Sequence, residues 1–123
     1  MAGLSRRLAA AATALATAVL LASCGGGTNP DALAACKGIK AALADYDASQ
    51  HAATPQERAA LLRDAHHQVA RVQGDAALAN SADGSYDALM TIVQEAEVMP
   101  FHDVAAALRA ACSSIDGQNY DAG

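Results

Sequence analysis

Apolar residues recur at three- and four-residue spacing in four stretches of the chain, which is the periodicity of one face of an α-helix. The residues between them are mostly polar or alanine, so each stretch has one apolar and one solvated face. In chain order, the apolar positions are Leu33, Cys36, Ile39, Leu43 and Tyr46; Leu62, Ala65, Val69, Val72, Ala76 and Ala79; Tyr86, Leu89, Val93 and Ala96; and Phe101, Val104, Leu108, Cys112 and Ile115. The pattern predicts four amphipathic helices.

Capping residues and breaks mark where these helices begin and end. Asn29-Pro30-Asp31 and the capping box Thr54-Pro55-Gln56-Glu57 are typical helix starts, with a polar cap followed by proline. Residues 80–84 interrupt the pattern, and Pro100 separates the third helix from the fourth. The apolar rhythm of the second helix continues through Gly74, so we expect that glycine to be a weak point within the helix.

Short connections between the helices favour antiparallel neighbours. We therefore expect an all-α fold, a small up-down four-helix bundle over residues 30–117, followed by a polar tail at 118–123. The alternative is a three-helix bundle with the fourth segment as a cap. The chain has one phenylalanine, three tyrosines and no tryptophan, a composition that suits closely packed helices better than strands.

The N-terminal residues have the character of an export signal. Arg6 and Arg7 precede an apolar run over residues 8–22, which is short for a membrane span, and the run ends in Leu21-Ala22-Ser23-Cys24. This segment resembles the signal peptides of bacterial lipoproteins, which end in an aliphatic residue, two small residues and a cysteine. The resemblance implies a diacylglyceryl group on the Cys24 thiol and cleavage before Cys24. The alternative is an uncleaved anchor helix, and the residues leave open whether export uses the general or the twin-arginine route.

This resemblance also predicts where the protein is found. Residues 1–23 would be the signal peptide, and residues 24–29 would be the lipidated cysteine and a glycine-rich tether. Two or more acyl chains, such as palmitate, hold a protein stably on a membrane. We expect a lipid-anchored protein on the extracytoplasmic side of the cell membrane.

Two cysteines remain beyond the leader, Cys36 and Cys112. They form an even pair in an exported chain, and an oxidising compartment favours disulfides. An antiparallel first and fourth helix would place them at the same height, on apolar stripes that face each other. We expect them to form a disulfide; the alternative is two buried thiols.

The search for catalytic motifs finds none: the chain lacks a phosphate-binding glycine loop, a His-Glu-x-x-His zinc motif and a Gly-x-Ser-x-Gly elbow. We therefore expect that the protein is not an enzyme and binds no cofactor. We also expect the interior of so small a bundle to have little room for a pocket of about 300 Å3. His66 and His67 are adjacent, so their side chains point about 100° apart and cannot share a metal as an i, i+4 pair would. We place both on a solvated or flanking face.

One end of the predicted bundle collects polar residues from its first and third loops. Two histidines and several carboxylates there could hold zinc or a similar ion, with His51, Glu97 and His102 as the candidate ligands, although ordinary loops produce the same composition. The residues collected at this end are Asp47, His51, Glu95, Glu97, Met99, Phe101, His102 and Asp103, with Phe101 expected to point mainly into the core.

The function expected from these features is binding. The net charge of −5, or −7 without Arg6 and Arg7, argues against nucleic acid as a partner. We expect a non-catalytic envelope lipoprotein that binds another envelope component, and the alternative is a carrier of a small molecule or divalent metal. Because the lipid is attached before the first helix, the second loop (Asn80, Ser81 and Asp83) should face the membrane, and the end with His51 and His102 should face the partner.

Overall fold

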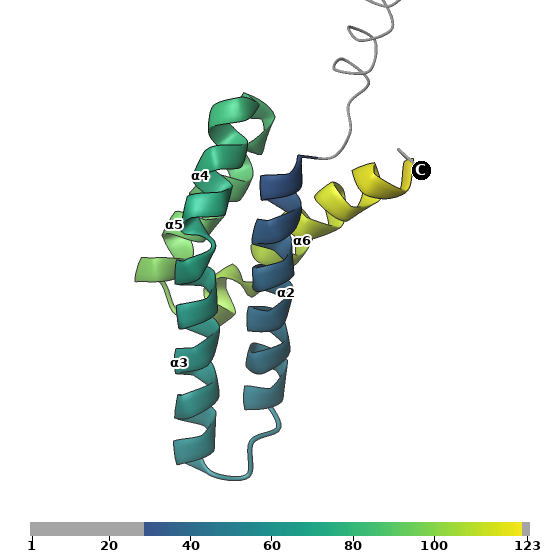
Figure 1. Cartoon of the computed structure of the whole chain (residues 1–123). Coiled ribbons are helices and arrows are strands. Elements are labelled where there is room, and N and C mark those ends of the chain that lie inside the picture. Colours follow the sequence, from purple (N-terminus) through teal and green to yellow (C-terminus); the bar gives the residue numbers. More distant parts are fainter. Residues whose placement is uncertain (1–28, 122–123) are drawn as a thin grey trace, which may run out of the picture.

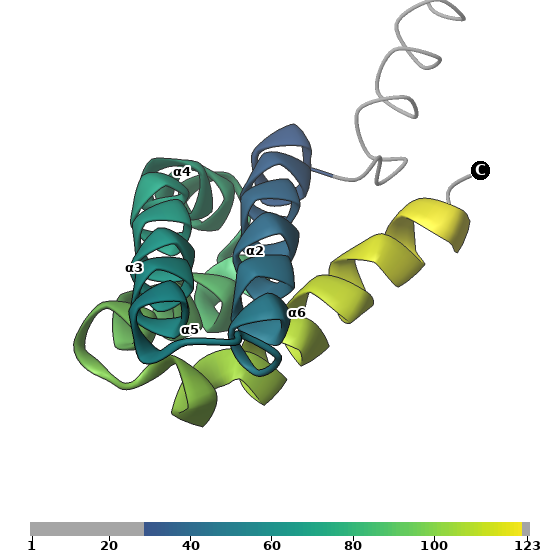
Figure 2. The same ribbon diagram turned by 90° about the horizontal axis from the view of Figure 1, so that it is seen from below.

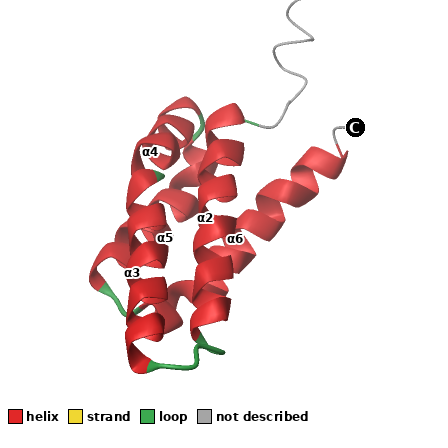
Figure 3. Ribbon diagram, turned by 60° about the horizontal axis from the view of Figure 1, so that its bottom comes forward, coloured by secondary structure: helices red, strands yellow, loops and turns green. Residues whose placement is uncertain are grey.

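The computed structural model describes residues 29–121, with side chains described through Gly117. The leader, Cys24 and most of the tether therefore lie outside the described residues, as do Ala122 and Gly123. The elements are α2 (Pro30–Ser49), α3 (Pro55–Arg71), α4 (Gln73–Ala82), the short 3-10 helix η1 (Gly84–Tyr86), α5 (Asp87–Val98) and α6 (Phe101–Asp121). The described part contains helices and loops and no strand (Figure 3). The predicted all-α, four-helix bundle is confirmed.

The helices run alternately up and down when α3 and α4 are taken together as one arm (Figure 1). α2 and α3 form a long antiparallel hairpin, and α4 continues in the direction of α3 (Figure 1). α5 returns along α4 and the upper part of α3, and α6 then crosses α2 obliquely, with its last turns extending away from the other helices (Figure 2). The beginning of α2 and the end of α6 lie at one end of the molecule, and the α2–α3 loop lies at the other.

The predicted apolar stripes meet in one core. Ile39, Val69, Val93 and Leu108, one from each of the four predicted helices, are at most 1% exposed. Many of the remaining core positions are alanines, which lets the helices approach closely. Ile92, which the pattern places beside the stripe of its helix, is also buried. Within residues 29–121, no helix is both long and apolar enough to cross a membrane.

Capping hydrogen bonds form at the two predicted helix starts. The Asn29 side chain accepts hydrogen bonds from the backbone N–H groups of Asp31 (2.8 Å) and Ala32 (3.1 Å). At the start of α3, the Thr54 hydroxyl accepts from the N–H of Glu57 at 3.1 Å. The Glu57 carboxylate accepts in return from the N–H of Ala53 at 3.2 Å, one residue before the cap. These bonds satisfy N–H groups that have no partner within the helix.

Three helix boundaries differ from the expected ones. α4 continues to Ala82, into the break expected at residues 80–84. The second predicted helix is divided at Val72, whose N–H bonds to the carbonyl of Val69 in a tighter turn, so that α3 and α4 are separate elements. The division comes two residues before Gly74, the expected weak point. α6 continues through Gly117 to Asp121, four residues into the expected tail. A glycine makes a helix less stable but ends it mainly where it adopts a left-handed conformation, and Gly117 remains helical.

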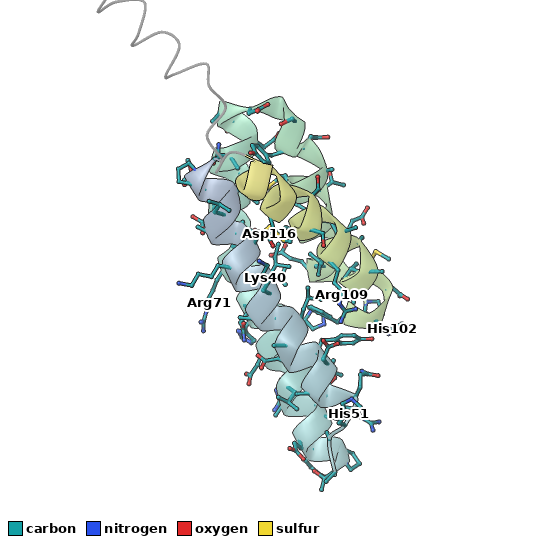
Figure 4. The ribbon with its side chains drawn as sticks, turned by 90° about the vertical axis from the view of Figure 1, so that its right-hand side faces the viewer. Lys40, His51, Arg71, His102, Arg109 and Asp116 are labelled. Carbon is teal, nitrogen blue, oxygen red and sulfur yellow. A yellow bond between two sulfur atoms is a disulfide. The ribbon has the colours of Figure 1, made fainter. Side chains whose placement is uncertain are left out.

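The predicted disulfide joins α2 to α6. Cys36 and Cys112 are both buried, and their Cα atoms are 5.4 Å apart although 76 residues separate them. Two surface ion pairs join the same helices: Arg109 contacts Asp47 at 2.5 Å, and Lys40 contacts Asp116 (Figure 4). Exposed pairs of this kind contribute little stability, so the disulfide and the apolar core hold α6 in place.

Candidate functional site

Two neighbouring grooves flank His66 on α3. We call the first, of about 570 Å3, the His67 groove, and the second, of about 500 Å3, the Arg58 groove. The His67 groove is lined by His66, His67, Ala70, Glu97 and Val98. The Arg58 groove is lined by Tyr46, Gln50, Arg58, Leu62, His66, Pro100, Phe101 and His102. Three helices, α2, α3 and α6, contribute to the Arg58 groove, which makes it the more complete candidate site.

The Arg58 groove results from the unequal lengths of the helices. The α2–α3 hairpin extends beyond the turn between α5 and α6, so the first turns of α3 and the loop before them project past the other helices (Figure 1). The groove lies where α6 begins against this hairpin. The expectation of little room for a ligand inside so small a bundle does not apply to this groove, because its space lies at the surface beside the helix ends.

Aromatic rings line the inner side of the Arg58 groove. The Phe101 ring is 2% exposed, as its place on the apolar stripe of α6 predicts. The Tyr46 ring lies against it, with ring centroids 5.2 Å apart and planes tilted by 32°. The His66 ring meets Phe101 edge-on, at 5.5 Å and 86°. These contacts hold three rings from three helices in fixed relative positions.

His66 is also oriented by the backbone of α5. Its Nδ1 atom lies 3.2 Å from the carbonyl oxygen of Ala96. Because a carbonyl oxygen only accepts hydrogen bonds, this contact assigns the proton of the neutral ring to Nδ1. The Nε2 atom is then left as a hydrogen-bond acceptor. His66 is half-buried and His67 is exposed, so the expected flanking or solvated positions are confirmed, but His66 is more constrained than its sequence position indicates.

The Arg58 groove holds one permanently cationic side chain, that of Arg58, in an acidic protein. Its lining includes Arg58, His66 and His102 and no carboxylate, whereas the chain as a whole has a net charge of −5. Among the described residues, Arg58 makes no ion pair. His102 is exposed, and its Nε2 atom lies 3.0 Å from the carboxylate of Asp103.

The structure does not bring the three candidate metal ligands together. Glu97 lines the His67 groove, His102 lines the Arg58 groove, and His51 lines neither. His51 lies near the tip of the hairpin, while His102 lies further up, at the start of α6 (Figure 4). The same projection of the hairpin that creates the groove separates these residues. Within the described part of the chain, no group of three His, Cys, Asp or Glu residues is placed to hold a metal ion.

The sequence did not identify the groove residues Tyr46, Gln50, Arg58 and His66 as site residues. A signal was present, because Arg58, Leu62 and His66 follow one another at four-residue spacing and therefore share one face of α3. Tyr46 and Gln50 have the same spacing on α2. The spacing does not predict that these two helix faces lie next to the start of α6.

Comparisons of the chain with protein-family models, with curated proteins and with solved structures find no match. Because a helical bundle supports many functions, the fold alone does not identify one. The features of this chain that bear on function are the groove and the N-terminal sequence.

Proposed function

We propose that this protein is a lipid-anchored, non-catalytic binding protein of the cell envelope. Its anchor would be acyl chains on Cys24, and its partner would be another component of the envelope. The Leu21-Ala22-Ser23-Cys24 motif and the glycine-rich residues after it support the anchor. The observation that carries the binding role is the Arg58 groove, in which three helices hold aromatic, cationic and amide side chains around an open space of about 500 Å3.

The dimensions of the chain suit such a role. A tether from Cys24 to Pro30 reaches at most about 20 Å when fully extended. The 20 residues of α2 add about 30 Å between the tether and the hairpin loop. The groove would then lie well above the membrane surface, on the part of the bundle furthest from the anchor.

Photo-crosslinking in native membranes tests this proposal. A photoreactive amino acid in place of Gln50 lies in the groove, and the same amino acid in place of Ser81 lies at the opposite end of the bundle. We expect the Gln50 position to yield an identified envelope component and the Ser81 position to yield none. Crosslinks from Ser81 alone would contradict the proposed binding surface.

The second candidate function is that of a small-molecule carrier. The volume of the Arg58 groove, about 500 Å3, is within the range of about 300–1,000 Å3 typical of ligand sites. Tyr46 and Leu62 provide an apolar surface, and Gln50, Arg58 and His66 provide polar groups in the same lining. The divalent-metal version of this carrier has less support, because its three candidate ligands are dispersed.

A further inference from the structure

We propose that the Arg58 groove selects a small organic acid, with the carboxylate bound by Arg58 and the apolar body against the Tyr46 ring and Leu62. This inference rests on the proposed binding role and adds the chemical class of the ligand. It involves Tyr46, Arg58 and His66, none of which the sequence identifies as a site residue.

The charge of the groove favours an anion. Arg58 is permanently cationic, and its planar guanidinium can bind both oxygens of a carboxylate at once. No other described side chain neutralises it, and no carboxylate lines the groove to repel a bound acid. The Asp103 carboxylate, next to the lining residue His102, lies 3.0 Å from the Nε2 atom of that ring. A cationic ligand or a metal ion would meet Arg58 unfavourably.

The rings favour a flat or apolar body on that acid. The partly buried Tyr46 ring is held in place by the buried Phe101 ring behind it, with centroids 5.2 Å apart, so a ligand ring can contact Tyr46 without ordering a new side chain. Leu62 and Pro100 extend this apolar lining. The Nε2 atom of His66, left as an acceptor by the bond at Nδ1, could additionally accept a hydrogen bond from a ligand hydroxyl or amine.

Three probes that share one ring but differ in charge test the inference: benzoate, benzyl alcohol and benzylamine. Each is titrated into the full chain, purified with its anchor in detergent, and binding is followed through the backbone and arginine side-chain signals in ¹H–¹⁵N NMR spectra. We expect benzoate to bind at least tenfold more tightly than benzylamine, with benzyl alcohol between them. The signals that move should belong to the lining of the Arg58 groove.

Two matched variants locate the charge that matters. Arg58→Gln should weaken benzoate binding at least tenfold, whereas Arg63→Gln should leave it unchanged, because Arg63 is exposed on the same helix and lines neither groove. Circular dichroism of both variants should match that of the wild type, since both side chains lie at the surface. Benzylamine binding as tightly as benzoate, or equal benzoate affinity in the Arg58→Gln variant, would overturn the inference.

The outcome also separates this inference from the proposed function. If no probe binds but the crosslinker at Gln50 still yields an envelope component, the organic-acid inference fails and the binding role stands. If benzoate binds through Arg58 but the crosslinker yields nothing, the selectivity of the groove stands and the proposed partner does not.

Discussion

Gly38 of α2 lies directly against Val72, the residue at which α3 gives way to α4. A Cβ atom at position 38 would overlap the Cγ1 methyl of Val72 and would lie 3.9 Å from the carbonyl oxygen of Gln68. Val72 is 5% exposed and has a stiff, β-branched side chain, so its methyl group cannot easily move away. The close approach of α2 to the junction of α3 and α4 therefore depends on a glycine.

Replacing Gly38 by alanine should destabilise the protein. Overpacking a core contact costs about 1–3 kcal/mol, and the better helix propensity of alanine recovers at most about 1 kcal/mol of it. We expect a net loss of about 1 kcal/mol, seen as a fall of several degrees in the melting temperature. Adding Val72→Ala to this variant should cost less than Val72→Ala in the wild type, because the methyl that clashes is gone.

Gly74→Ala is the matched control. No atom lies within 4 Å of a Cβ at position 74, and Gly74 is within α4. The substitution should stabilise the protein by about 0.5–1 kcal/mol. Thermal melts of the two single variants should move in opposite directions, and a shift of the same sign in both would contradict the proposed contact between Gly38 and Val72.

The disulfide should contribute a large share of the stability. Closing a loop of 76 residues is worth about 4–5 kcal/mol in the chain-entropy treatment. We expect Cys36→Ala with Cys112→Ala, or reduction of the native bond, to lower the melting temperature by more than about ten degrees. Thiol titration in a Cys24→Ser background checks the bond itself: denatured, unreduced protein should show no free thiol, and two reactive thiols would show that the bond is absent.

The cap of α3 offers a smaller, local test. Thr54→Ala removes the hydroxyl that accepts from the N–H of Glu57 and should cost about 1 kcal/mol. Gln56→Ala, at an exposed position in the same turn, should change the stability by less than about 0.5 kcal/mol. Urea unfolding followed by circular dichroism measures both, and equal midpoints for the two variants would rule out the capping role.

Asp83 should make the start of η1 sensitive to acid. The backbone N–H of Ser85, 2.9 Å from the carboxylate, and then the Ser85 hydroxyl lower the pKa of Asp83 below its ordinary value of 3.8. Because the pKa of Asp83 is lower in the folded protein, its ionised carboxylate stabilises the fold. This stabilisation is complete above the ordinary pKa and is lost as the pH falls through the folded-state pKa. Carboxyl ¹³C NMR should show a titration midpoint below 3.8 that moves upward in the Ser85→Ala variant. A midpoint that is the same in both proteins would exclude the Ser85 hydroxyl as a cause.

The anchor is tested by Cys24→Ser. Only the thiol of Cys24 can carry the diacylglyceryl group that the lipobox motif predicts, so this variant should lose radiolabelled lipid and retain its leader. Ala22 and Ser23 are left intact, which keeps the export signal unchanged. Lipid label on the Cys24→Ser protein would exclude this cysteine as the attachment site.

The sequence by itself determined the helices of the fold and the disulfide that joins the first helix to the last. The spacing of apolar residues is set by the 3.6-residue period of a helix, and caps such as Asn29 and Thr54 act within four residues of the chain. The pairing of Cys36 with Cys112 followed from the register of antiparallel helices. The spacing and the caps are local, so a single sequence contains them. The cysteine pair is 76 positions apart, but only Cys36 and Cys112 remain once Cys24 is assigned to the lipid.

Only the tertiary structure decided where the chemistry lies. The Arg58 groove exists because the hairpin projects past the turn between α5 and α6 and because α6 crosses α2 obliquely. The same geometry separates His51 from His102, which the loop order alone had placed at one end. Crossing angles and helix offsets arise from how alanine-rich faces and contacts such as that of Gly38 with Val72 pack together, and packing depends on residues far apart in the chain.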